Sequence, residues 1–257
     1  MSIGKLIRTL QSEFSFLKEG KDAAYYHARR LLKHPHEGEF RALRFVPDSL
    51  AGGFLDVGAN QGQSVESIRI FKPNAPIHCF EANGLLAEKL RGRYAGHSKI
   101  QVESFGLADK KQSRPLYIPV YKNFVYDGLA SFDKEFASTW LSDETLYWFS
   151  PAKLKLLETP CATERLDDLN LNPIVIKIVV QGFQYQVVNG GVGYNWTQPQ
   201  IQAAVIATDN SLGYAFGKND GAQGSKLAAF DIHDSVAGGG GTGCHLIIKP
   251  FLNAARY

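Results

Sequence analysis

The chain has 257 residues, with a formal net charge of +3 from 28 basic and 25 acidic side chains. An α/β chain of this length buries roughly three quarters of its unfolded surface, so neither a metal nor a disulfide is needed to hold it together. The small net charge does not indicate a nucleic-acid partner. Three widely spaced cysteines without a C-x-x-C pair favour reduced thiols in a cytoplasm over a zinc site or a disulfide framework: Cys79, Cys161 and Cys244.

Residues 1–50 are predicted to form an N-terminal helical extension that caps the domain of residues 51–257. Apolar residues recur there at helical spacing: Ile7, Leu10, Phe14 and Leu17. A second helical stretch covers residues 23–32 and ends before His34-Pro35-His36. Charges recur from Lys5 onward, so we expect neither a signal peptide nor a stable membrane insertion, and place the protein in the cytoplasm. The mixed charges of the extension favour a solvated face over docking on an anionic membrane.

Residues 54–62 read FLDVGANQG, a short apolar strand followed by an acid and a glycine loop that leads into a helix-like stretch. Glycines at such a turn bring backbone amides and a helix N-terminus close to a ligand. Dinucleotide-binding loops use G-x-G-x-x-G, whereas this loop is G-x-x-x-G. The pattern therefore favours another nucleotide-like cofactor, although packing alone can also demand such a loop. The candidate cofactor-binding residues are Asp56, Gly58, Asn60, Gln61 and Gly62.

A second apolar strand, residues 77–80, ends in Glu81. In a doubly wound sheet, the carboxylate at the tip of the second strand lies beside the first loop and accepts the hydroxyls of a ribose. Glu81 is thus a further cofactor-binding candidate. His78, inside the same strand, is interpreted as a core or edge histidine rather than a base.

The chain continues with alternating elements, which predict helices on both faces of a mainly parallel sheet. Helices are predicted over residues 64–71 and 85–94, and strands over residues 100–104 and 116–121. Asp109 follows the third strand, where the sheet geometry predicts a hydrogen bond to an adenine amino group. Residues 122–160 are rich in aromatic side chains, which form either a lid or acceptor wall, or the packing of a longer insertion.

Four blocks, in this order, resemble the FkbM family of S-adenosylmethionine-dependent methyltransferases. They are DVGANQG at residues 56–62, FEAN at 80–83, ERLDDL at 164–169 and IKIVVQG at 176–182. The resemblance covers roughly residues 50–195 and implies a three-layer Rossmann-like sheet of the class I methyltransferases. It also implies S-adenosylmethionine as cofactor, and a hydroxyl of a sugar or polyketide-like small molecule as acceptor.

Two acids that the resemblance implies are replaced in this chain, by Val179 and Gln184, and no glutamate follows Glu164. A valine cannot accept the proton that an aliphatic hydroxyl loses on methylation. These replacements fit a diverged enzyme, a relative that only binds its ligand, an engineered chain or a misread sequence, and a single sequence does not decide between them. The acidic pair Asp167 and Asp168 is interpreted as a turn or a solvated rim.

Asp209 is the remaining candidate for the catalytic base, because a strand predicted over residues 201–207 ends just before it. Lys177, Gln181 or Asn210 would assist it, although a strand-to-turn cap also explains Asp209. With Val179 in place of an acid, no second hard ligand is available and no metal is predicted.

The function predicted is O-methyl transfer from S-adenosylmethionine, and the alternative is a cofactor-binding relative with little or no catalysis. A nucleotide-dependent oxidoreductase is disfavoured by the spacing of the glycine loop. Residues 238–241 are four consecutive glycines and indicate a flexible segment near the last strands. Nothing in the sequence indicates an oligomeric state.

Overall fold

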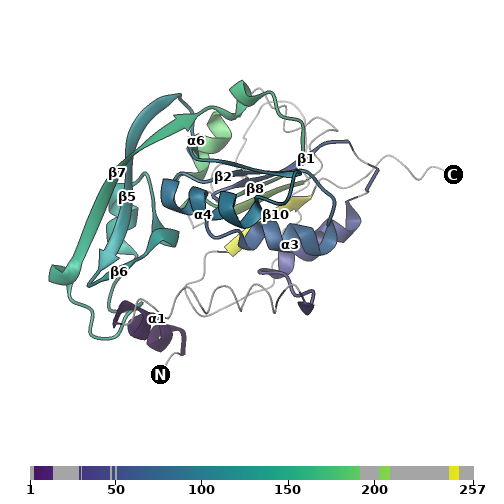
Figure 1. Ribbon diagram of the computed structural model, residues 1–257. Helices are drawn as coiled ribbons and strands as arrows, with labels where there is room; N and C mark the ends of the chain where they lie inside the picture. The colour runs from purple at the N-terminus through teal and green to yellow at the C-terminus, as the bar shows by residue number, and fades with distance from the viewer. Residues whose placement is uncertain are drawn as a thin grey trace, which may run out of the picture.

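The computed structural model describes residues 3–13, 29, 31–46, 48–49, 51–191, 203–208 and 243–248. These residues form an α/β structure with two sheets, of which the larger is mainly parallel (Figure 1). The predicted α/β class with a mainly parallel sheet is therefore confirmed. Most predicted elements that fall on described residues lie within a residue or two of the observed ones, but the strand predicted over residues 116–121 begins earlier, at Gln112. Asp209, Asn210 and residues 238–241 lie outside the described residues.

The larger sheet has the strand order β10-β9-β8-β1-β2-β3. Its strands are β1 (Gly53–Val57), β2 (Ile77–Phe80), β3 (Ile100–Glu103), β8 (Pro173–Ile178), β9 (Ala203–Thr208) and β10 (Gly243–Ile248). All neighbours pair in parallel except β10, which is antiparallel to β9. The chain builds outward from β1 to β3 and then returns to β8 on the other side of β1. This reversal creates a switch point between β1 and β8, where open α/β sheets bind ligands beyond the carboxyl ends of their strands.

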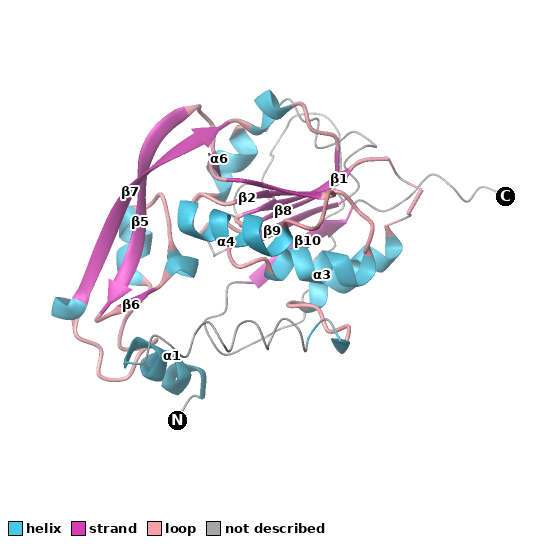
Figure 2. Cartoon of the chain, viewed as in Figure 1, coloured by secondary structure: helices cyan, strands magenta, loops and turns pink. Residues whose placement is uncertain are grey.

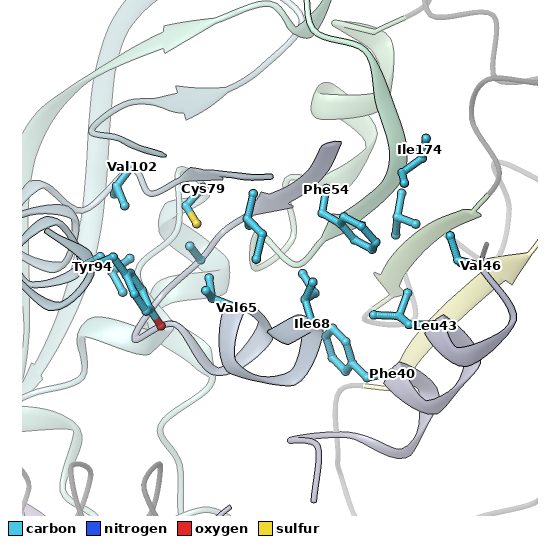
Figure 3. Packing of buried hydrophobic residues seen from close by; sticks show 14 of the residues in the cluster. Phe40, Leu43, Val46, Phe54, Val65, Ile68, Cys79, Tyr94, Val102 and Ile174 are labelled. Carbon is cyan, nitrogen blue, oxygen red and sulfur yellow. The ribbon is translucent and has the colours of Figure 1, made fainter. Parts of the chain in front are cut away.

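Strand alternation buries the two faces of this sheet under different helices (Figure 2). Phe54 points to one face, which is covered by α3 (Gln63–Phe71), α4 (Gly84–Tyr94) and the 3-10 helix η1 (Gly38–Phe45). Figure 3 shows that Phe40 and Leu43 of η1 lie beside Ile68 of α3 in this core. Leu55 points to the other face, which is covered by η4 (Leu166–Leu169) and α6 (Gln184–Asn189).

The smaller sheet has the strand order β4-β7-β5-β6 and lies to one side of the parallel sheet (Figure 1). Its strands are β4 (Gly106–Leu107), β5 (Gln112–Tyr121), β6 (Phe124–Val125) and β7 (Leu154–Glu164), with the short helices η2 (Asp127–Leu129), α5 (Lys134–Thr139) and η3 (Pro151–Lys153) between β6 and β7. Much of the aromatic content of residues 122–160 packs into a core beside this sheet, made of Tyr121, Phe124, Tyr126, Leu141 and Leu146. For these side chains the packing interpretation holds.

The N-terminal extension contacts both sheets. Helix α1 (Ile3–Glu13) lies beside β6, where Thr9 Oγ1 accepts a hydrogen bond from the Tyr147 backbone N–H at 2.9 Å. Among its described side chains, Thr9 and Ser12 are buried, whereas Ile7 and Leu10 are about two-fifths exposed, at 41% and 44%. The helical spacing thus predicted the helix but not its packed face. The domain boundary near residue 50 stays a prediction. None of the described helices is both long and apolar enough to cross a membrane.

Candidate functional site

A cavity lies where the carboxyl ends of β1, β2 and β8 face the smaller sheet and the segment before η1. Residues from each of these neighbouring elements line it. They include His36 and Glu37 before η1, Gly58 and Asn60 after β1, Glu81 after β2, Gly106 of β4, Leu116 of β5, Asp127, Ser131 and Phe132 before α5, and Val179 to Gln181 after β8. The cavity therefore occupies the switch point of the parallel sheet, as the sheet topology requires of a ligand site.

The glycine loop after β1 has the close backbone approach that its sequence predicted. Gly58 has a φ of 75°, and a Cβ atom there would lie 1.9 Å from the carbonyl oxygen of Val179. Gly62 has a φ of 84°, and a Cβ atom there would lie 2.6 Å from the Tyr94 hydroxyl. Both positions exclude any side chain. The loop consequently leads straight from β1 into the N-terminus of α3.

A buried ion pair lies directly beneath this loop. Asp56 and Lys177 are register partners on β1 and β8, and Lys177 Nζ lies 2.8 Å from Asp56 Oδ1. The same ammonium donates to the carbonyl oxygen of Gly58 at 2.7 Å. Burial raises the pKa of Asp56, which is 0% exposed, and the Lys177 charge opposes that shift. The pair thus fixes the start of the glycine loop.

This geometry assigns Asp56 and Lys177 a different position from the one predicted. Asp56 is enclosed below the loop and is not among the residues that line the cavity. Lys177 lines the cavity, yet its ammonium is already bound to the Asp56 carboxylate and to a loop carbonyl. With these two contacts made, the Lys177 side chain serves the structure of the loop rather than an acceptor hydroxyl.

Glu81 lies beside the glycine loop, as its place at the tip of β2 predicted. Its Oε2 accepts a hydrogen bond from the Asn60 backbone N–H at 2.6 Å, and its Oε1 accepts one from the Asn83 backbone N–H at 2.8 Å. Burial raises the pKa of Glu81 to about 7, while these two N–H groups lower it. Each carboxylate oxygen keeps a further lone pair that could accept a ligand hydroxyl.

The structure brings some of the predicted site residues together and leaves others aside. Gly58, Asn60, Glu81, Lys177 and Gln181 line the cavity. Gln61 and Gly62 belong to the same loop, but neither they nor Asp109 are among the described residues that line the cavity. The buried Oδ1 atom of Asn60 has no hydrogen-bond partner among the described residues, so a ligand that donates a hydrogen bond would satisfy it.

Several lining residues were not found by sequence reasoning, because they come from segments without a motif. His36 and Glu37 follow the break after the second predicted helical stretch, and Asp127, Ser131 and Phe132 lie in the aromatic segment. Ser131 Oγ donates to the carbonyl oxygen of Gln181 at 2.7 Å. This bond attaches the aromatic segment to the loop after β8. Only the density of aromatic residues, interpreted as a lid or as packing, pointed to this wall.

The two positions where the resemblance implies acids carry side chains that cannot act as a base. Val179 lines the cavity and offers no proton acceptor, while Gln184 is 2% exposed in α6. Asp167 pairs with Arg165 at 2.8 Å, which agrees with a structural role at the rim. Within the described part of the chain, no group of three or more His, Cys, Asp or Glu side chains could hold a metal ion.

Comparisons with known proteins leave this site to be interpreted from its own residues. No protein-family model matches the chain, and no curated protein is significantly similar to it. A crystal structure of the methyltransferase FkbM from Methylobacillus flagellatus KT is similar with a TM-score of 0.40 and 14% sequence identity, over 65% of this chain. The chain spans 36% of the length of that protein's chain. Similarity at this level carries no weight for function.

Proposed function

We propose that the protein binds S-adenosylmethionine in this cavity and transfers its methyl group to a hydroxyl of a sugar or polyketide-like small molecule. The observation that carries the proposal is the Glu81 carboxylate, held 2.6 Å from the Asn60 N–H of the glycine loop and facing the same cavity. A loop without side chains beside an acid at the next strand tip suits the ribose of an adenosyl group. The proposal assigns ribose binding to Glu81.

The remaining lining divides into an apolar part and a polar part. Ala82 packs with Leu116 and Phe132, and the Phe132 ring lies against Gly106, where a Cβ atom would be 2.7 Å from it. This apolar part suits the flat face of a purine. Gln63 and Ser64 line the cavity at the first turn of α3, where backbone amides favour the carboxylate of an amino-acid group.

When bound, the cofactor supplies an already activated methyl group on a sulfonium. The protein therefore has to orient an acceptor oxygen and exclude water. The Ser131–Gln181 hydrogen bond and the contact between the Phe132 and Phe183 rings, at 5.1 Å, close one wall of the cavity. These contacts support the water exclusion that the proposal needs.

Isothermal titration with S-adenosylmethionine and with S-adenosylhomocysteine tests the proposal. We expect binding in the micromolar range, about −8 kcal/mol. Glu81→Gln should weaken it roughly tenfold to a hundredfold, because a hydrogen bond to a charged group is lost. Glu88→Gln is the matched control, since Glu88 is an exposed acid that pairs with Arg91 on the surface of α4. Absence of binding to both compounds in the wild type would refute the proposal.

A second candidate function is cofactor binding with little or no catalysis. Val179 favours it, because this cavity residue follows β8 directly and cannot accept a proton. Val179→Asp separates the two candidates. A gain in S-adenosylhomocysteine formation with hydroxyl acceptors supports an enzyme that lacks an acid there, whereas unchanged turnover counts against that account.

A further inference from the structure

We propose that His36 is the general base that takes the proton of the acceptor hydroxyl. The inference rests on the proposed methyl transfer and names the residue that fills the role left open by Val179. His36 and Glu37 line the same cavity as Gly58, Glu81 and Val179, although they come from the segment before η1. Among the described residues of the lining, His36 is the one histidine.

The other ionisable groups of the lining already have a partner or a proposed role: Glu37 pairs with His36 itself, and Glu81 is assigned to the ribose. The Lys177 ammonium is bound to Asp56 and to the Gly58 carbonyl. Both oxygens of Glu81 accept backbone N–H groups, and Asp127 Oδ1 accepts the Gly128 N–H at 3.0 Å. Gln181 has an amide side chain, which is not a base. His36 therefore combines access to the cavity with a chemistry suited to proton transfer near neutral pH.

The backbone of His36 is fixed to the helix that follows the glycine loop. Its N–H donates to Ser67 Oγ at 2.8 Å, and that hydroxyl donates to the Gln63 carbonyl oxygen at 2.9 Å. On the preceding residue, the Pro35 carbonyl oxygen accepts from Arg29 at 2.7 Å. These contacts connect His36 to α3, whose N-terminus begins at the glycine loop. A base held in this way keeps its position relative to the cofactor.

The surroundings of the ring shift the pKa of His36 downward, chiefly through burial, and this favours its basic form. Burial lowers the pKa of His36, Glu37 raises it, and Arg29 and Lys177 lower it. The Glu37 carboxylate lies 3.8 Å from His36 Nε2 and can stabilise the imidazolium after proton transfer. The ring is 37% exposed, so the proton can pass from it to solvent.

The proposed step balances without any further reactant. The acceptor oxygen attacks the methyl carbon, the carbon–sulfur bond breaks, and its electron pair stays on sulfur as a neutral thioether. The hydroxyl proton passes to an imidazole nitrogen, so the positive charge lost from the sulfonium reappears on His36. Glu37 then faces a cation, which is the charge arrangement that stabilises the product state.

A binding measurement tests this placement without a known acceptor. Proton and carbon NMR of carbon-13-labelled histidines would follow the pKa of His36 in complexes of the full chain with S-adenosylmethionine and with S-adenosylhomocysteine. The sulfonium charge of the first compound should lower the His36 pKa by roughly one unit relative to the second, because like charges repel across a partly solvated site. The NMR signal of His36 is identified as the one that is missing from the spectrum of His36→Gln.

His34 and His97 are internal controls, because neither lines the cavity. Their NMR signals at a fixed pH should be the same in both complexes. Glu37→Gln should lower the His36 pKa further, since the carboxylate that raises it is removed. Equal His36 pKa values in the two complexes would overturn the assignment while leaving the proposed function intact. Absence of binding in isothermal titration would instead overturn the proposed function, and the assignment with it.

Turnover gives an independent readout for any hydroxyl acceptor that the wild type methylates. His36→Gln should lower kcat about a hundredfold or more, and change the affinity for S-adenosylmethionine less than threefold. The dependence of kcat on a deprotonated group near neutral pH should disappear in the variant. An unchanged kcat and pH profile would overturn the role of His36.

Discussion

The parallel sheet buries charged side chains at its carboxyl edge, whereas the smaller sheet buries aromatic and aliphatic ones. Among the described residues, the buried charged side chains are Asp56, Glu81 and Lys177. Among the described residues of the smaller sheet region, Ser131 and Thr163 carry buried hydroxyls, and each donates its proton to a backbone carbonyl oxygen. Burying charges opposes folding, so their collection at one edge favours that edge as the place where a ligand binds.

Breaking the buried ion pair should have the largest effect on stability. Lys177→Met leaves the Asp56 carboxylate buried without a partner, and the free energy of unfolding should fall by about 3–5 kcal/mol. Urea denaturation measures the change. Lys155→Met is the matched control in the smaller sheet, because Lys155 is exposed on β7 and should change stability by less than about 0.5 kcal/mol.

The double variant Asp56→Leu with Lys177→Met separates the unpaired charge from the loss of packing. Removing both charges should recover much of the stability lost in the single variant. If the double variant is no more stable than Lys177→Met, the loss does not come from an uncompensated charge. S-adenosylmethionine binding should remain weak in both, because the Gly58 carbonyl has lost its ammonium donor.

A core truncation in the smaller sheet should lower stability without changing the site. Leu146 is 1% exposed in the aromatic core, and Leu146→Ala should destabilise the protein by about 2–5 kcal/mol. Affinity for S-adenosylmethionine, measured by isothermal titration where the variant is folded, should change less than threefold. Ile176→Ala is the matched truncation in the parallel sheet, at 0% exposed, and should weaken binding as well. Equal effects of the two variants on affinity would contradict the separation of the two regions.

Glu81, at the edge of the parallel sheet, should make the free energy of unfolding depend on pH. Its pKa is raised from 4.5 to about 7 by burial, so the folded protein holds a proton that the unfolded chain has lost between these values. Stability should therefore fall as pH rises from about 4.5 to about 7, by up to about 1.4 kcal/mol per pH unit. Urea denaturation at several pH values measures this slope. Glu81→Gln should flatten it, and an unchanged slope in that variant would assign the dependence to another group.

The two regions also differ in how far the sequence predicts them. The glycine loop and Glu81 were predicted because their signals are local: a turn that excludes side chains, and an acid at a strand end. The ion pair was not predicted, because Asp56 and Lys177 become neighbours only through the register of β1 and β8. The sequence therefore placed Asp56 on the ligand side and Lys177 beside the base.

His36 and Phe132 illustrate the other limit of local patterns. Each lines the cavity from a segment that carries no motif, and their positions depend on how the extension and the smaller sheet pack against the parallel sheet. In the same way, α1 was predicted from Ile7 and Leu10, yet it buries Thr9 and Ser12. Tertiary packing determines which face of α1 is buried, because the hydroxyl of Thr9 accepts the Tyr147 N–H.

The smallest expected effect comes from two helix caps, one in each region. Asn83 Oδ1 accepts the Leu85 N–H at 3.1 Å at the start of α4, and Asp133 Oδ1 accepts the Phe136 N–H at 3.0 Å at the start of α5. Replacing either residue by alanine should lower stability by about 1 kcal/mol.

Only the first cap is connected to the site, because the Asn83 backbone N–H holds Glu81 Oε1 at 2.8 Å. Asn83→Ala should therefore weaken S-adenosylmethionine binding several-fold, since a loosened first turn of α4 releases one of the two donors that orient the Glu81 carboxylate. Asp133→Ala should leave the affinity within twofold of the wild type. Equal affinities in the two variants would show that Glu81 is positioned by Asn60 alone, and would move the boundary of the site from α4 to the glycine loop.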